Sequence, residues 1–158
     1  MRRGVWYNRA TEVVMGRKED ACALHAKGAN CAQSVLSAFA ETVGLRPQVA
    51  MRIASGFGAG MGRMCGTCGA VTGAFMALGM RHGMTEPEQK DIKEKNYAMV
   101  REFAARFAKK NGSTLCRELL GCDIGTPDGM AEAKAKDLFA VRCMKFVGDA
   151  VEIAEEMM

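Results

Sequence analysis

One stretch of the sequence reads CGTCGAVTG from Cys65 to Gly73, and small residues dominate it. Glycines recur here at spacings of three and four residues, at Gly66, Gly69 and Gly73. Residues at such spacings share one face of a helix, and a face without side chains lets a second helix approach closely. The stretch therefore predicts a helix that begins near Thr67 and packs tightly against another helix.

A second glycine-rich segment, GFGAGMG, lies just upstream at residues 56–62. It does not fit a dinucleotide-binding fingerprint, because Arg63 stands where a further glycine is needed and no strand precedes it. We expect a loop whose glycines allow tight turns and close approach to another backbone or to a cofactor. The candidate cofactor-binding glycines are Gly60, Gly62 and Gly69.

The remainder of the 158-residue chain is rich in Ala, Met, Leu, Glu and Lys and shows no long apolar–polar alternation. We expect an all-α fold, with residues 1–158 forming one compact domain of about five to seven helices around the glycine-rich cysteine loop. Residues 1–16 would be an extension or lead into the first helix. The longer helices are expected at residues 8–27, 30–44, 67–83, 85–110 and 130–158.

The composition excludes several classes of protein. Hydrophobic residues make up 49% of the chain, which is typical of a globular domain, and a net charge of +4 is too small to indicate nucleic-acid binding. The longest weakly apolar stretch, residues 70–80, is too short to span a bilayer. Residues 1–9 contain no apolar signal segment, so we expect a cytoplasmic protein. An Ala/Gly/Met-rich helical domain is also expected to form a homo-oligomer.

The chain contains seven cysteines, an odd number that cannot all be paired. In a reducing compartment, several cysteines favour metal binding or redox chemistry over a disulfide framework. Cys65 and Cys68 form a Cys-x-x-Cys pair that could share a metal or close a disulfide. Gly69 follows the pair in place of histidine, which excludes c-type haem attachment.

Three cysteines from distant parts of the chain are expected at the starts of helices, namely Cys31, Cys68 and Cys116. The partial positive charge at a helix N-terminus stabilises a thiolate, so we expect lowered pKa values and affinity for an anionic cluster. Cys143 and Cys22 lie within expected helices, where their positions are typical of core residues.

The two histidines are His25 and His82, which are far apart in the sequence. Neither has a metal-ligating partner at helical spacing, so we expect core or solvent-exposed roles for both. The same separation gives little support to a Ser/His/Asp hydrolase.

Several motifs taken together resemble the C_GCAxxG_C_C family of redox-active proteins over about residues 21–151. They are GANCAQSV at residues 28–35, GMGR at 60–63, CGAVTGA at 68–74, CRELLGCD at 116–123, and Cys143.

The resemblance implies a quartet of thiolate ligands formed by Cys31, Cys68, Cys116 and Cys143, with Cys65 and Cys122 as neighbours or substitutes. The family is similar to part of the split-Soret cytochromes, which carry an iron–sulfur cluster beside their haems. The present chain has no haem-attachment motif, so only the cluster carries over.

Three hypotheses follow from these observations. The first is a redox protein that binds an iron–sulfur cluster or another metal and exchanges electrons with an unidentified partner. The second is a metal-free thiol–disulfide oxidoreductase or redox sensor that uses Cys65 and Cys68. The third is a helical binding or assembly protein with structural cysteines. Whether the chain is an enzyme stays open.

Overall fold

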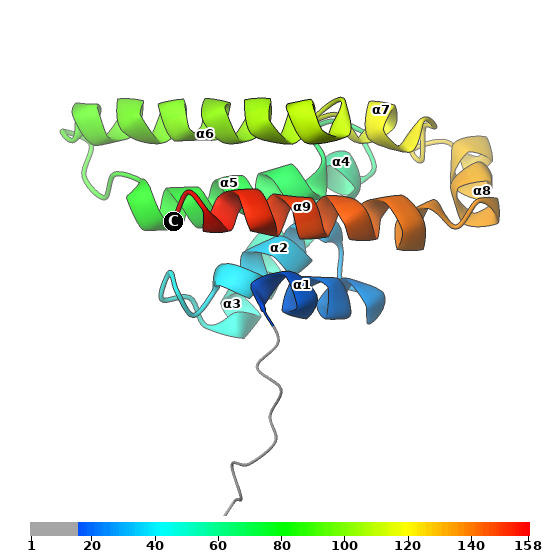
Figure 1. Cartoon of the computed structure of the whole chain (residues 1–158), viewed down its shortest axis with the longest axis horizontal. Coiled ribbons are helices and arrows are strands. Elements are labelled where there is room, and N and C mark those ends of the chain that lie inside the picture. The colour runs from blue at the N-terminus through cyan, green and yellow to red at the C-terminus, as the bar shows by residue number, and fades with distance from the viewer. Residues whose placement is uncertain (1–15) are drawn as a thin grey trace, which may run out of the picture.

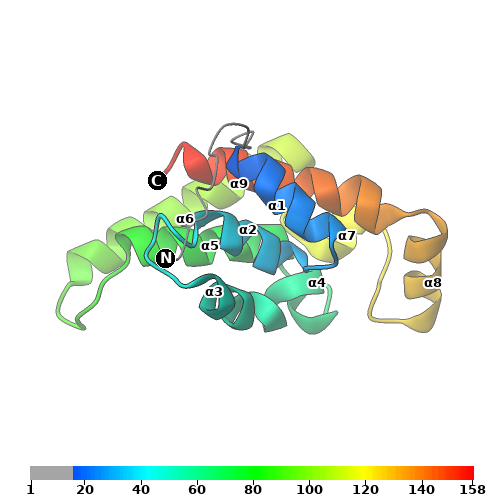
Figure 2. The ribbon, with the colours of Figure 1, turned by 90° about the horizontal axis from the view of Figure 1, so that it is seen from below.

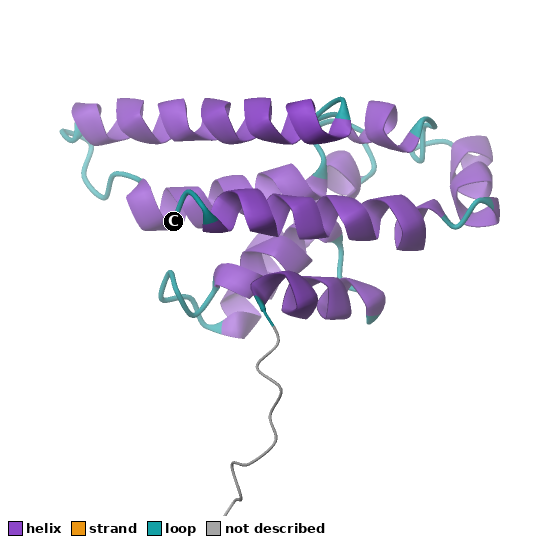
Figure 3. Ribbon diagram, viewed as in Figure 1, coloured by secondary structure: helices purple, strands orange, loops and turns teal. Residues whose placement is uncertain are grey.

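The computed structural model describes residues 16–158, so the expectations for residues 1–15 lie outside the described residues. Throughout the described part the chain forms helices and loops (Figure 3). The helices are α1 (Arg17–Ala26), α2 (Cys31–Phe39), α3 (Pro47–Ile53), α4 (Gly58–Gly62), α5 (Gly69–His82), α6 (Lys90–Asn111), α7 (Cys116–Leu120), α8 (Pro127–Ala135) and α9 (Met144–Glu155). Leaving aside α4, whose interior has left-handed backbone angles, eight regular α-helices occur in residues 16–158, against five to seven expected.

The start of α2, which the sequence predicts at residue 30, is held by a capping box at Asn30. The Asn30 side-chain oxygen accepts a hydrogen bond from the Gln33 N–H at 2.9 Å, and the Gln33 side-chain oxygen accepts one from the Asn30 N–H at 3.0 Å. Two backbone donors at the helix start are thus satisfied. The helix ends at Phe39 rather than at Gly44, and residues 40–44 form a turn.

The packing of α5 against α2 confirms the close helix–helix contact expected from the glycine spacing. A β-carbon built on Gly73 would lie 2.8 Å from the Ala32 carbonyl oxygen and 3.0 Å from Val35 Cβ. One built on Gly69 would lie 3.0 Å from the Ala32 backbone nitrogen. Real β-carbons do not fit at such distances without a shift, so the two helices meet backbone to backbone only because these positions are glycine.

Helix α6 extends alongside α5 and α9 (Figure 1). Its fully buried residues are Phe103 and Phe107, whose rings lie 6.1 Å apart. Phe75 of α5 contacts Phe103 edge to face, and Phe146 of α9 contacts Phe107 in the same way. This aromatic column joins the three helices. Among the helices described, none is both long enough and apolar enough to cross a membrane.

The expected helix at residues 85–110 begins five residues late, at Lys90. The Thr85-x-x-Glu88 pattern in the sequence predicts a capping box at residue 85, but no such box forms. The Gln89 side-chain oxygen accepts the Thr85 N–H instead, at 2.8 Å, and holds residues 85–89 in a turn.

The expected helix at residues 130–158 is divided into three pieces, which accounts for the larger helix count. Helix α8 begins earlier, at Pro127, where the Thr126 hydroxyl caps it by accepting the Gly129 N–H at 3.1 Å. The chain then turns at Asp137, which has a left-handed φ of 51°. A π-helical segment, Phe139–Cys143, leads into α9. Figure 2 shows α8 set apart at one end of the molecule as a result.

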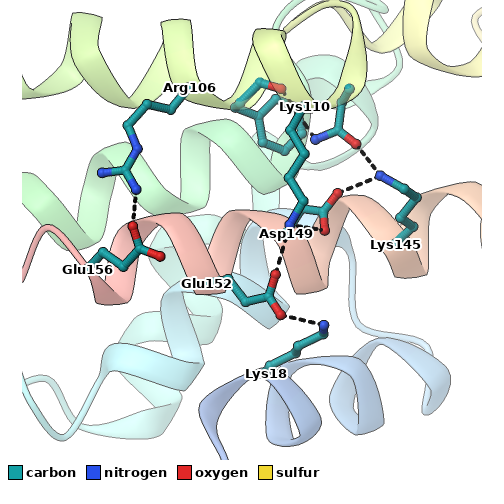
Figure 4. Close-up of polar contacts among 9 residues, drawn as sticks. Lys18, Arg106, Lys110, Lys145, Asp149, Glu152 and Glu156 are labelled. Carbon is teal, nitrogen blue, oxygen red and sulfur yellow. Dashed lines mark hydrogen bonds and ion pairs between the residues drawn. The ribbon is translucent and has the colours of Figure 1, made fainter.

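A network of ion pairs connects α1, α6 and α9 (Figure 4). At its centre is Asp149, whose side chain is only 8% exposed. Its carboxylate forms ion pairs with Lys145 Nζ at 2.6 Å and with Lys110 Nζ at 2.9 Å. Glu152 pairs with Lys110 at 2.9 Å and with Lys18 at 2.6 Å. Burial by itself raises the pKa of Asp149, but the two lysines outweigh it and the net pKa is lowered.

The glycine contact can be tested with two alanine substitutions in the same helix. We expect Gly73→Ala to lower the free energy of unfolding by about 1–3 kcal/mol, because the new methyl group pushes α5 away from α2. Gly79 has open space around its Cα, so Gly79→Ala should raise the free energy by about 0.5–1 kcal/mol. Urea unfolding of both variants measures this, and equal effects would contradict the backbone contact.

The pairing of Asp149 predicts a loss of stability in acid. Because its folded-state pKa lies below the ordinary value, the pairing stabilises the fold above about pH 4 and this contribution disappears as the pH falls further. We expect Asp149→Asn to cost about 1–3 kcal/mol at neutral pH and to flatten the acid limb of the stability curve. Glu156→Gln, at the exposed pair with Arg106, is the control and should change little.

Candidate functional site

Four cysteines line one cavity of about 100 Å³, which we call the thiol cavity. Cys31 and Cys116 are the first residues of α2 and α7, Cys68 immediately precedes α5, and Cys143 ends the π-helical segment. Each is at most 8% exposed. The structure therefore brings together the quartet that the family resemblance implies, from positions spread over most of the chain.

The rest of the lining of the thiol cavity is mainly apolar. It includes Leu119, Leu120, Ile124, Phe139 and Phe146. His25 and Asn30 supply the remaining polar side chains. In such surroundings the thiols are the main groups available for chemistry, and water has few partners to hold it there.

A left-handed turn in the glycine-rich segment brings the cysteine loop close to α7. Ala59, Gly60 and Met61 have φ values of 56°, 65° and 64°. A β-carbon built on Gly60 would lie 2.7 Å from Cys65 Cα and 2.8 Å from Cys116 Cβ. Glycine is therefore required at residue 60 by the close approach, which the loop was expected to make, whereas Ala59 and Met61 adopt similar φ values with a side chain.

Backbone hydrogen bonds then hold the cysteine loop to the start of α7. The Cys116 N–H donates to the Gly66 carbonyl at 2.7 Å, and the Cys68 N–H donates to the Thr114 carbonyl at 2.8 Å. These reciprocal bonds set the positions of Cys68 and Cys116 on the wall of the cavity.

The predicted helix-start positions are confirmed for Cys31 and Cys116, and Cys68 is itself the N-cap of α5 in place of Thr67. The expected lowering of their pKa values is wrong. Burial raises the pKa of Cys68 to about 11, although the backbone N–H groups of Ala70 and Val71 oppose the rise. Burial, reinforced by the neighbouring thiols, raises the pKa of Cys116 further. Desolvation outweighs the helix N-terminus here because the cavity is largely apolar.

Cys31 and Cys143 form a closely coupled pair within the quartet. A hydrogen bond from the Cys31 thiol lowers the pKa of Cys143 in spite of its burial. The same hydrogen bond, together with burial, raises the pKa of Cys31 well above its ordinary value. The pKa values of the two thiols are therefore shifted in opposite directions, and Cys143 ionises before Cys31.

Cys65 and Cys122 are buried but lie outside the lining of the thiol cavity. The Cys65 thiol donates to Asp123 Oδ1 at 3.4 Å, and Asp123 also pairs with Arg117 at 2.8 Å. Cys22 on α1 is half-buried, with its sulfur 3.8 Å from a backbone carbonyl of α9, and it too is outside the cavity. All seven cysteines are free thiols.

Of the three candidate cofactor-binding glycines, two lie at the thiol cavity or support it and one does not. Gly69 lines the thiol cavity, and Gly60 supports it through the contacts with Cys65 and Cys116. Gly62 is exposed, with no atom within 4 Å of a β-carbon built on it. Within residues 16–158, no three His, Cys, Asp or Glu side chains converge closely enough to hold a single metal ion.

Sequence reasoning missed His25, which lines the thiol cavity. One ring nitrogen lies 3.0 Å from the Ala29 carbonyl oxygen and the other lies 3.2 Å from the Phe139 carbonyl oxygen. The ring therefore connects the end of α1 to the segment that carries Cys143. No sequence signal indicates this role, because His25 and Phe139 are 114 residues apart.

The coupling of Cys31 and Cys143 can be tested in metal-free, reduced protein. We expect Cys31→Ala to raise the pKa of Cys143, since burial remains while the hydrogen-bond donor is lost. The pH profile of Cys143 alkylation, read by peptide mass spectrometry, should then shift to higher pH. Cys22→Ala is the control, and a profile that does not respond to Cys31→Ala would contradict the coupling.

A family model described as "Putative redox-active protein (C_GCAxxG_C_C)" matches residues 29–157. The matched region begins just before α2 and ends after α9, so it contains all four cysteines of the thiol cavity. No curated protein and no solved structure matches the chain. The family match covers most of the sequence, and the chain belongs to the C_GCAxxG_C_C family of redox-active proteins.

Proposed function

We propose that this protein is an electron carrier whose thiol cavity binds an iron–sulfur cluster through Cys31, Cys68, Cys116 and Cys143. The observation that carries the proposal is the meeting of four thiols, from four separate elements, on one cavity with mainly apolar walls. Thiolates are the ligands that hold such clusters, and four are the usual number.

The arrangement suits a cluster better than a single ion. A cluster takes its thiolates at separate iron atoms around its body, whereas a lone ion needs ligands that converge on one point. The thiols surround a cavity of about 100 Å³, several times the roughly 10–15 Å³ that one water needs. Among the described residues, no three His, Cys, Asp or Glu side chains converge closely enough to hold one metal ion.

The protonation of the thiols also bears on binding. The pKa values of Cys31, Cys68 and Cys116 are raised, so these thiols stay protonated while the cavity is empty. The apolar cavity therefore does not have to hold the negative charge of four thiolates without a metal. Metal binding deprotonates coordinating thiols and supplies the compensating positive charge. When bound, the cluster would supply reversible electron transfer, while the surrounding leucines, isoleucine and phenylalanines exclude water from it.

A second candidate function is supported by the position of Cys31 and Cys143 on one cavity, where each thiol shifts the pKa of the other. In a metal-free thiol–disulfide cycle, the two thiols would form one S–S bond and pass two electrons and two protons to a partner disulfide, which becomes two thiols. This pair differs from the expected couple of Cys65 and Cys68. The Cys65 thiol is engaged with Asp123 and lies outside the cavity.

Anaerobic purification from iron-replete cells tests the cluster. We expect brown protein with bound iron and acid-labile sulfide, because the quartet supplies four thiolates. Serine at any one of the four positions should lower the iron content at least severalfold, as loss of a ligand or its support commonly does. Cys22→Ser and Cys122→Ser are matched controls, since both cysteines lie outside the cavity.

Colourless, metal-free protein from the same preparation would reject the cluster. Mild oxidation would then separate the alternatives. A thiol count that falls by two, with a Cys31–Cys143 disulfide found by peptide mapping, would identify the thiol–disulfide cycle. An unchanged count would reject that cycle and leave the cysteines with structural roles, which Cys68→Ser would test through the melting temperature.

A further inference from the structure

A second cavity of about 600 Å³, which we call the outer cleft, adjoins the thiol cavity. The two share five lining residues, which are His25, Asn30, Ala59, Ile124 and Phe139. Because these residues line both, the outer cleft lies directly beside the cavity that holds Cys31 and Cys143.

The charged residues of the outer cleft are mainly basic. Arg63 and Lys134 line it, and neither makes an ion pair within residues 16–158. Asp137 is the one carboxylate among the lining residues, and it too makes no ion pair within residues 16–158, so the lining has an excess of one cation. By contrast, the nearby cations Arg117 and Lys136 are paired with acids. Unpaired cations at the walls of a cleft raise the local concentration of anions.

The position of Arg63 is set by a costly backbone conformation. Its φ is 71°, a left-handed angle that is unfavourable for a residue other than glycine. The Arg63 carbonyl oxygen would lie 2.7 Å from a β-carbon built on Gly125, so the loop after α7 packs directly against this turn. The surrounding structure thus holds an arginine in a strained conformation at the edge of the cleft, as occurs at ligand-binding sites.

The walls of the outer cleft are otherwise largely apolar. Met130 and Met144 line it together with Ile124 and Phe139. Methionine side chains are flexible and polarisable, so they adapt to ligands of different shape. The volume also falls within the range of small-molecule sites, about 300–1,000 Å³.

We propose that the outer cleft binds small organic anions and delivers them to the thiol cavity. Arg63 and Lys134 would contact the anionic group, and Met130, Met144 and Phe139 would contact the apolar body. Because the cleft has an excess of cations and shares walls with the thiol cavity, small organic anions are the class of reactant, or of small electron carrier, that would react with the cysteines. This inference deepens the proposed function, because it rests on the thiol cavity being the reactive site.

Two alkylating reagents of similar size, one charged and one neutral, test the proposal in the full chain, metal-free and reduced. Iodoacetate is an anion and iodoacetamide is neutral, and each forms a C–S bond with a thiolate and releases iodide. The measured quantity is the rate constant with iodoacetate divided by that with iodoacetamide, determined separately for Cys31 and Cys143 by peptide mass spectrometry. We expect the double substitution Arg63→Gln and Lys134→Gln to lower this ratio by roughly three- to tenfold.

Matched controls separate a local effect from one of net charge. Lys90→Gln with Lys95→Gln removes two exposed charges that lie outside the cleft and make no ion pair within residues 16–158, and it should leave the ratio unchanged. The ratio at Cys22, which lines neither cavity, should not respond to either pair. Met130→Trp should slow both reagents at Cys31 and Cys143 by narrowing the cleft. Circular dichroism and melting confirm that each variant is folded.

An equal ratio in the wild type and the Arg63/Lys134 variant would overturn the proposal, as would a Met130→Trp variant labelled at the normal rate. These failures are distinct from failure of the proposed function. Iron and sulfide content test the cluster in a separate preparation, whereas the alkylation ratio reads access and charge selection in metal-free protein.

Discussion

The backbone contact between α2 and α5 is the constraint on which the rest of the structure depends. Gly69 and Gly73 allow α5 to approach α2 so closely that a β-carbon at either position would collide with it. The same contact brings Cys31 next to the start of α5, since a β-carbon on Gly69 would lie 3.1 Å from Cys31 Cβ. Two of the four cavity cysteines are therefore positioned by helix packing itself, and the loop held at Gly60 adds Cys116.

The thiol cavity shows a competition between burial and charge. Helix starts favour thiolates, but the apolar surroundings of Cys68 and Cys116 raise their pKa values instead. Within the Cys31–Cys143 pair the effect is opposed at one thiol, because the Cys31 thiol lowers the pKa of Cys143. Protonated thiols keep such a buried site neutral, and a metal that displaces their protons supplies the compensating positive charge. That behaviour fits a redox protein, and it also keeps the core of the domain stable in the meantime.

Local signals in the sequence predicted the helix starts with mixed success. The Asn30 cap and the glycine face of α5 were predicted correctly, because each depends on residues within one or two turns. The predictions of a helix start at Thr85 and of an unbroken last helix were wrong. Gln89 competes for the Thr85 N–H, and the left-handed Asp137 breaks the helical pattern although no glycine or proline stands there to indicate it. Tertiary packing can hold a residue in such a conformation, and a local pattern cannot show that.

The sequence by itself determined that the protein is helical, that small residues let two helices meet, and that four cysteines match one family. Only the tertiary structure decided which thiols share a cavity, and it separated Cys65 and Cys122 from the quartet although Cys65 is three residues from Cys68. It also placed His25 beside the cysteines and Arg63 at the outer cleft. Helix propensity and capping act over a few residues, whereas burial and the meeting of distant side chains depend on how all the helices pack.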